Sequence, residues 1–210
     1  MDMYANCGEL EKAREIWFLG ENKKIVETLL IWSVVSWSSL IARYAKLDHT
    51  HVALELYRRM KTEGIVPDLV LYTILLTACC HVGLVKEGEK LFDEMCNVYC
   101  LKPTLEHYTC MVAIFGSAGC FDQAMSVIKV MPCSDHPAVW LALLCACKRW
   151  GNVRLGKVAF DQVVRLDKSC TAAYALMANT LAANDMQENA EKIEAMKARL
   201  GLEGAMNRTL

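Results

Sequence analysis

The sequence has no long hydrophobic run, little proline and almost no net charge. Its 210 residues contain no stretch of eighteen or more uncharged apolar residues, so a membrane-spanning helix is not expected. Four prolines and eleven glycines are too few for a collagen-like or low-complexity chain. The formal net charge of −1 excludes a uniformly basic nucleic-acid coat, although a local basic stripe remains open. Because 54% of the residues are apolar, we expect a folded chain with a buried core.

Cysteine is abundant, with eleven residues, but it lacks the spacing of a metal site. The number is odd and no secretory signal is recognisable, which argues against a disulfide framework. No Cys-x-x-Cys pair occurs, and Cys145-x-Cys147 and Cys96-x-x-x-Cys100 have no second pair to complete a zinc site. We therefore expect reduced thiols that act as small core residues, with no metal and no cofactor.

The N-terminal residues do not have the composition of a targeting segment. Met1–Tyr4 leads directly into Gly8–Ala13, which is typical of a helix start. Two interpretations stay open: the chain is not imported into an organelle, or its true N-terminus is missing.

A repeat of 32 to 36 residues runs through the chain. Aromatic residues that each precede an apolar stretch recur at intervals of 35, 36, 32 and 34, at Trp37, Tyr72, Tyr108, Trp140 and Tyr174. Small residues within amphipathic stretches recur at the same intervals, at Ala53, Gly88, Ala124, Gly156 and Ala190. A turn former precedes each small residue by five positions, at Asp48, Gly83, Gly119, Gly151 and Asp185. Landmarks that keep the same intervals indicate a true structural repeat.

Each unit is predicted to be a helix, a short Gly or Asp turn, a second helix and a linker. Prolines in the linkers 64–68 and 101–104 are typical of helix ends. One helical hairpin cannot bury its own apolar face, but stacked hairpins share a continuous core. The sequence therefore predicts an all-α fold, an α-solenoid of about five hairpins plus a partial one. Residues 19–33 break the period, and we interpret them as an insertion, with a docking helix as the alternative.

The repeat motifs distinguish between two helical-hairpin families of this period. No copy carries the Trp-x-x-Leu-Gly of the tetratricopeptide pattern. Val34–Ile41, Ala53–Met60 and Gly64–Asp68 instead closely resemble a pentatricopeptide repeat, the helical-hairpin family of plant organelle RNA-binding proteins. The alternating lengths resemble the PLS subclass, which mixes long and short repeats. The resemblance implies a right-handed α-solenoid of stacked helix-turn-helix repeats.

The same resemblance divides the chain into seven segments. They are a partial short-type repeat with an irregular insertion (1–33), a standard repeat (34–68), a long-type repeat (69–104), a short-type repeat (105–136), a first extension motif (137–170), a second extension motif (171–204) and a tail (205–210).

The family's mode of RNA recognition implies candidate base-reading residues. Each repeat of the family is understood to face one base of single-stranded RNA, read from the first helix and the repeat end. The matching pairs here are Ser38 with Asp68, Thr73 with Thr104, and Thr109 with His136. The first pair resembles the combination that favours guanine, whereas His136 departs from the usual Asn or Asp and leaves its base unassigned.

Val35 and Val70 occupy the family's base-sandwiching positions. Each candidate also has a purely structural alternative. The hydroxyls of Ser38 and Thr73 could satisfy backbone donors at a helix start, Asp68 could cap the next helix, and the two valines could be core residues.

Residues 137–170 are basic, with six cationic and two anionic side chains that give a local charge of +4. The remainder of the chain therefore sums to −5. Lys148, Arg149, Arg154 and Lys157 are candidate phosphate contacts, because such contacts supply sequence-independent affinity for nucleic acid. A solvated helical face is the alternative.

The resemblance implies sequence-specific binding of single-stranded RNA in organellar RNA processing, in a mitochondrion or chloroplast. We expect recognition of C-to-U editing sites by residues 34–136, with an editing cofactor or deaminase recruited in trans through residues 137–204. No enzymatic activity is expected, because the His-x-Glu and Pro-Cys-x-x-Cys of zinc deaminases are missing from the sequence. Two alternatives are a protein-interaction scaffold and a truncated fragment without an independent role.

Overall fold

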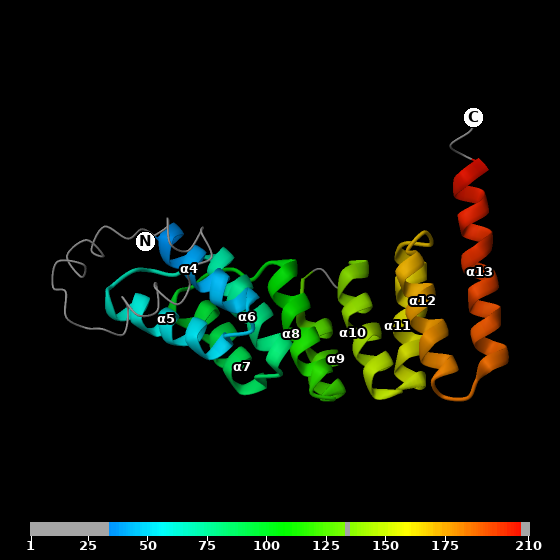
Figure 1. Ribbon diagram of the computed structural model, residues 1–210, viewed down its shortest axis with the longest axis horizontal. Coiled ribbons are helices and arrows are strands. Elements are labelled where there is room, and N and C mark those ends of the chain that lie inside the picture. The colour runs from blue at the N-terminus through cyan, green and yellow to red at the C-terminus, as the bar shows by residue number, and fades with distance from the viewer. Residues whose placement is uncertain (1–33, 133–134, 207–210) are drawn as a thin grey trace. The chain divides into compact units, whose positions relative to one another are not determined.

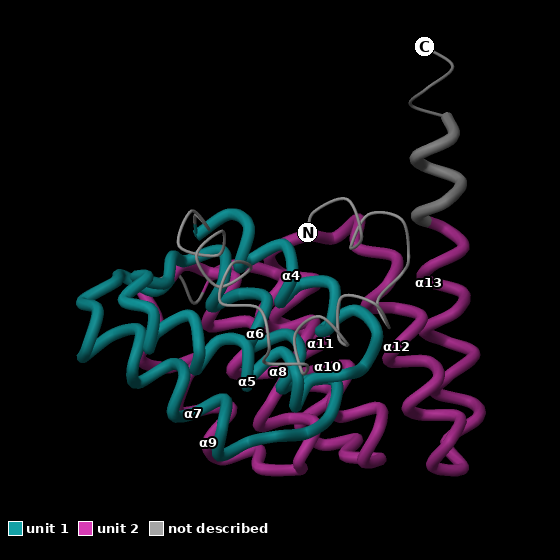
Figure 2. Tube along the Cα trace, turned by 60° about the vertical axis from the view of Figure 1, so that its left-hand side comes forward, with its two compact units in different colours: residues 1–103 teal, residues 104–210 magenta. Residues whose placement is uncertain are grey.

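The structure, a computed structural model, describes residues 34–132 and 135–206, apart from the side chains of residues 200–206. All regular secondary structure in these residues is helical, as predicted. The chain divides into two compact units, residues 1–103 and residues 104–210 (Figure 2). The partial repeat and insertion predicted for residues 1–33 lie outside the described residues.

The described part of unit 1 consists of two helical hairpins (Figure 1). Helix α4 (Val34–Lys46) pairs with α5 (Thr50–Thr62), and α6 (Leu69–Val82) pairs with α7 (Val85–Asp93). Helix α7 continues into a π-helical turn, η1 (Glu94–Val98). Helix α4 packs against α6 as well as α5, so the first helices of the two hairpins are neighbours.

Unit 2 repeats the same arrangement three times over its described residues (Figure 1). Its helices are α8 (Leu105–Ser117), α9 (Phe121–Val130), α10 (Pro137–Trp150), α11 (Val153–Leu166), α12 (Thr171–Ala182) and α13 (Gln187–Met206). Each first helix packs on the next, α8 on α10 and α10 on α12. The predicted stacking of hairpins is thus present within each unit.

The turn formers found in the sequence produce the hairpin turns. All of them adopt left-handed backbone angles, with φ of 59° at Asp48, 76° at Gly83, 75° at Gly119, 63° at Gly151 and 58° at Asp185. Glycine has no Cβ to oppose this conformation, and aspartate tolerates it better than most residues do. The small residues that follow, such as Ala53 and Ala124, are fully buried. These features of the repeat are confirmed.

The predicted use of cysteine as core residue is correct for only part of the set. The cysteines of the described residues are free, and Cys79 and Cys147 are fully buried. Cys100 and Cys145, in contrast, are exposed. For these two residues the prediction is wrong, because Cys100 lies in the linker after η1, with a φ of 52°, and Cys145 lies on a solvent-facing side of α10.

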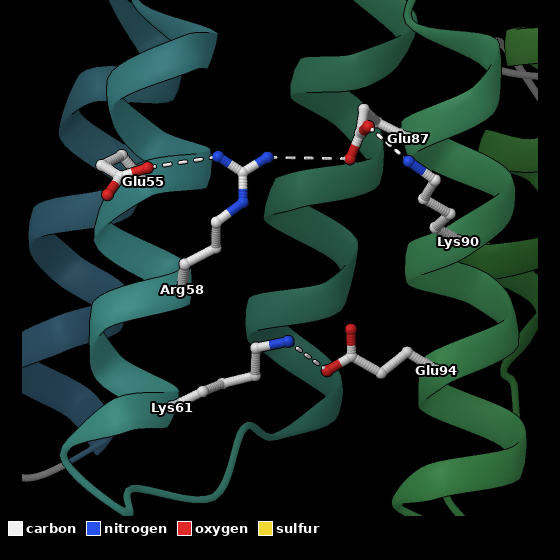
Figure 3. A network of polar contacts seen from close by, with 6 residues as sticks. All are labelled: Glu55, Arg58, Lys61, Glu87, Lys90 and Glu94. Carbon is white, nitrogen blue, oxygen red and sulfur yellow. Dashed lines mark hydrogen bonds and ion pairs between the residues drawn. The ribbon is translucent and has the colours of Figure 1, made fainter.

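A polar network joins α5, α6, α7 and η1 of unit 1, and its ion pairs are drawn in Figure 3. Glu94 Oε1 accepts hydrogen bonds from Tyr57 Oη at 2.8 Å and from Lys61 Nζ at 2.7 Å, and the hydroxyls of Tyr57 and Tyr72 lie 2.9 Å apart. Burial raises the pKa of both tyrosines above the usual value, so their hydroxyls stay protonated. The network ties η1 to α5 and α6, and Arg58 bridges Glu87 and Glu55 beside it.

Candidate nucleic-acid interface

The three predicted reading hydroxyls occupy equivalent places on three helices. Ser38, Thr73 and Thr109 are each the fifth residue of their helix, in α4, α6 and α8. Thr73 Oγ1 donates to the carbonyl of Leu69 at 3.1 Å, and Thr109 Oγ1 donates to that of Leu105 at 2.8 Å. Both threonine hydroxyls therefore bond backbone carbonyls of their own helices.

Ser38 differs from the two threonines because its hydroxyl is buried without a partner. The residue is 9% exposed, and Ser38 Oγ has no hydrogen-bond partner within the described part of the chain. An unpaired buried hydroxyl costs about 1–3 kcal/mol. The alternative that Ser38 satisfies a backbone donor is therefore wrong.

The three predicted repeat-end residues are all N-caps. Asp68 Oδ1 accepts from Leu71 N at 2.8 Å at the start of α6. Thr104 begins α8 in a capping box, and His136 Nδ1 accepts from Ala138 N at 3.2 Å at the start of α10. The capping alternative for Asp68 is confirmed. Capping uses one oxygen of its carboxylate, and the residue is exposed, so capping and a contact to a ligand are compatible.

The two predicted base-sandwiching valines are solvent-exposed. Val35 is 71% exposed and Val70 is 64% exposed, and they are the second residues of the neighbouring helices α4 and α6. Neither is a core residue, so the structural alternative for this pair is wrong. The equivalent residue of α8 is Glu106, which is also exposed. The apolar pair is thus a feature of unit 1.

A groove of about 190 Å³ runs between α4 and α6 in unit 1. Its lining residues are Ala42, Ala45, Lys46, Thr73, Ile74, Thr77, Ala78 and His81. Sequence reasoning missed Lys46 and His81, although both are the thirteenth residue of their helix. Because Ser38 and Thr73 are also at equivalent helix positions, the equivalent positions of Lys46 and His81 could have indicated these two residues from the sequence. The groove is thus lined by Thr73, a predicted base-reading residue, and by Lys46 and His81.

The predicted phosphate contacts are exposed and surround the turn between α10 and α11. Lys148 and Arg149 lie in the last turn of α10, Arg154 lies in the first turn of α11, and Lys157 follows one turn later. Arg165, the next cation along α11, lies 3.8 Å from the carboxylate of Asp135.

Over the described residues, no group of three or more His, Cys, Asp or Glu side chains is arranged to hold a metal ion. None of the helices described here is long and apolar enough to cross a membrane.

The fold and this surface place the chain in a class of proteins, the helical-hairpin repeat proteins. In this chain, neighbouring first helices carry polar and apolar side chains at equivalent positions. The comparisons with known proteins then identify the repeats. The PPR repeat family matches residues 33–81, and the PPR repeat matches residues 70–100 and 106–136. The chain therefore carries repeats of the PPR family over these segments.

Similar proteins occur in Arabidopsis thaliana. The pentatricopeptide repeat-containing protein At5g66520 is 36% identical over 202 residues, which cover 96% of this chain and 31% of that protein. The mitochondrial protein At3g53360 is 38% identical over 90% of this chain and 24% of its own length. The chloroplastic protein At3g49170 is 36% identical over 95% of this chain and 22% of its own length. The chain spans less than a third of these curated relatives.

A solved structure has the same fold. The pentatricopeptide repeat protein PPR10, crystallised in complex with an 18-nt psaJ RNA element, aligns with a TM-score of 0.71 at 17% identity. The alignment covers 85% of this chain and 27% of PPR10. The predicted α-solenoid fold is confirmed by this likeness.

Proposed function

We propose that this chain binds single-stranded RNA in organellar RNA processing. The observation that carries the proposal is the pair of exposed valines, Val35 and Val70, on the neighbouring helices α4 and α6. Hydration of exposed valine side chains is unfavourable, so contact with an apolar surface is favoured. The flat face of an unpaired RNA base offers such a surface. The similarity to PPR10, which was solved with RNA, and to relatives named as mitochondrial or chloroplastic supports the proposal.

Base preference follows from the groups beside the valines. The Ser38 hydroxyl is buried, so the exposed Asp68 is the member of the pair that a base can reach directly. The Asp68 carboxylate can only accept, and the Watson–Crick edge of guanine offers two neighbouring donors, where adenine offers one. Guanine is therefore the base that this pair is proposed to prefer. Thr73 in unit 1, and the pair Thr109 with His136 in unit 2, are proposed to read further bases.

Cationic side chains supply the sequence-independent part of the affinity. In unit 1, Lys46 lies at the groove between α4 and α6. In unit 2, the exposed cations Lys148, Arg149 and Arg154 offer contacts to phosphates. Each neutralised phosphate releases counterions, so binding is expected to weaken steeply with salt.

At a finer level, we propose that the bound RNA is a C-to-U editing site and that the deaminase acts in trans, recruited through residues 137–204. The motifs by which a zinc deaminase would act do not occur in these 210 residues. Supplying the chain to an organelle extract that lacks it, and sequencing the edited transcripts, tests this step. Unchanged editing at every site would overturn it.

The basic assay is a titration of the purified chain with labelled single-stranded RNA at low salt. We expect weak, salt-sensitive binding, because few repeats are available to grip bases. An RNA that matches the predicted base preferences should bind more tightly than its scrambled counterpart. Equal absence of binding to both RNAs at low salt would refute RNA binding. Recovery of protein partners that resist ribonuclease would then favour an interaction scaffold.

Replacing Asp68 by asparagine should change base preference without loss of stability. Asparagine caps helices as well as aspartate does, so the hydrogen bond to Leu71 N is retained and the melting temperature should stay close to that of wild type. An amide both donates and accepts, which matches adenine. We expect the ratio of guanine to adenine affinity to fall about tenfold or more. The measurement uses oligouridines that carry one guanine or one adenine.

Asp68→Ala is the matched control for that substitution. It removes both the cap and the reading group, so stability should fall by about 1 kcal/mol and base discrimination should disappear. A guanine-to-adenine ratio that is the same in wild type and Asp68→Asn would contradict a reading role for Asp68.

A further inference from the structure

We propose that Trp150 is a stacking platform for one unpaired RNA base, and that the cations around the α10–α11 turn hold the neighbouring phosphates. This inference rests on the proposed binding of single-stranded RNA and adds a second contact site to it. The platform lies in unit 2, outside the helices that carry the predicted base-reading hydroxyls.

The indole ring of Trp150 is both exposed and held in place. The side chain is 54% exposed, although a tryptophan at the end of an apolar helix would ordinarily be expected in the core. Its Nε1 donates to the carbonyl of Gly116 at 3.0 Å. Gly119 lies against the ring, because a Cβ added there would be 3.2 Å from Trp150 Cε2. A fixed aromatic ring loses little conformational freedom when it binds a ligand.

The segment that contains Trp150 carries only positive charge. Lys148, Arg149 and Arg154 are exposed, and no aspartate or glutamate occurs in residues 137–160. Arg154 lies in the first turn of α11, where the helix dipole disfavours a cation. Its presence there is therefore not explained by helix stability, whereas a bound anion would be favoured by both the arginine and the helix end.

An unpaired nucleotide complements both features of this surface. Its base stacks on an aromatic ring, and its phosphate pairs with lysine and arginine. An acidic peptide would match the charge but would leave the exposed face of the indole without a flat partner. Stacking also tolerates any base, so the platform would add affinity without adding sequence preference.

The test compares three substitutions of Trp150 in the full chain, with oligouridine as the probe. Trp150→Ala should weaken binding about five- to a hundredfold, and Trp150→Leu should weaken it similarly. Trp150→Phe keeps a ring but loses the bond to the Gly116 carbonyl, and it should restore most of the affinity. Thermal melting of each variant separates a lost ligand contact from a lost fold. The salt dependence of binding should be unchanged in all three variants.

Replacing the cations should change the salt dependence of RNA binding, which the Trp150 substitutions should not. Simultaneous replacement of Lys148, Arg149 and Arg154 by glutamine should flatten the plot of log affinity against log salt by about two units. Equal affinities of the leucine and phenylalanine variants would overturn the platform. Binding of polyglutamate that competes with RNA and is unaffected by Trp150→Ala would assign the surface to an acidic protein partner instead.

Failure of this inference is distinguishable from failure of the proposed function. If wild type binds RNA and responds to Asp68→Asn while the Trp150 variants bind normally, only the platform is wrong. If wild type binds no RNA at low salt, the proposed function fails and the platform fails with it.

Discussion

Replacing Gly116 by valine is expected to lower the free energy of unfolding by about 3 kcal/mol. Gly116 is buried in α8 where that helix approaches α10. A Cβ added at this glycine would lie 2.5 Å from Ala146 Cβ, a separation that a Cβ essentially never shows from a non-bonded atom. Valine adds two more methyl groups, so α8 and α10 must separate and the packing of Ile114 and Leu143 is loosened. Urea unfolding, followed by circular dichroism, measures the loss.

A residue swap provides the control for this prediction. The double variant Gly116→Ala with Ala146→Gly moves one methyl group from α10 to α8 and keeps the same total volume. The helix propensities of the two changes cancel, because alanine gains about 1 kcal/mol over glycine in one helix and loses it in the other. The double variant should therefore be close to wild type in stability. Wild-type stability in Gly116→Val would show that α8 and α10 do not approach as closely as described.

The close approach at Gly116 also connects stability to the proposed RNA platform. The carbonyl that holds the Trp150 indole belongs to Gly116 itself, and Gly119, against the ring, follows within one helical turn. Gly116 in α8 and Gly119 in the turn after it therefore allow α10 to approach α8 closely. This packing leaves Trp150, the last residue of α10, half exposed. The exposure of Trp150 is thus a result of helix packing.

The fold was predictable because the signals that determine it are local. The turn residues need left-handed backbone angles, which only a few residue types adopt easily, so Gly119 and Asp48 are recognisable from the sequence alone. Small residues such as Ala53 mark the places where the helices of a hairpin close on each other. Both signals recur with every hairpin, and their coincidence determines the period without any knowledge of tertiary contacts.

The exposure of the site residues was not predictable, because it depends on how neighbouring helices pack. Val35 and Val70 have the same sequence pattern as core valines, and only the packing of α4 against α6 leaves both in solvent. Ser38 and Thr73 occupy equivalent helix positions, yet one hydroxyl is buried without a partner while the other bonds its own helix. Trp150 ends an apolar helix, yet it is 54% exposed because of how α10 packs against α8.

The free energy of unfolding is expected to fall as the pH rises from about 9 to about 12. Burial raises the pKa of the Cys79 thiol to about 12, with nearby Glu87 adding to the shift, and burial raises that of Cys147 to about 12. In the unfolded chain both thiols ionise near their usual value of about 8.5. Between these values the unfolded state binds fewer protons than the folded state.

The sign and size of the alkaline effect follow from this difference. Stability is fully present below the unfolded pKa and is lost as the pH rises toward the folded value, by up to about 1.4 kcal/mol per pH unit for each thiol. Urea unfolding in steps from about pH 8 to about pH 11 gives the slope. The variant Cys79→Ala with Cys147→Ala removes both thiols, so its stability should depend less on pH than that of wild type. If the double variant and wild type lose stability in parallel, the buried thiols are not the groups that titrate. The alkaline loss would then come from the buried hydroxyls of Tyr57 and Tyr72, because burial also raises their pKa values.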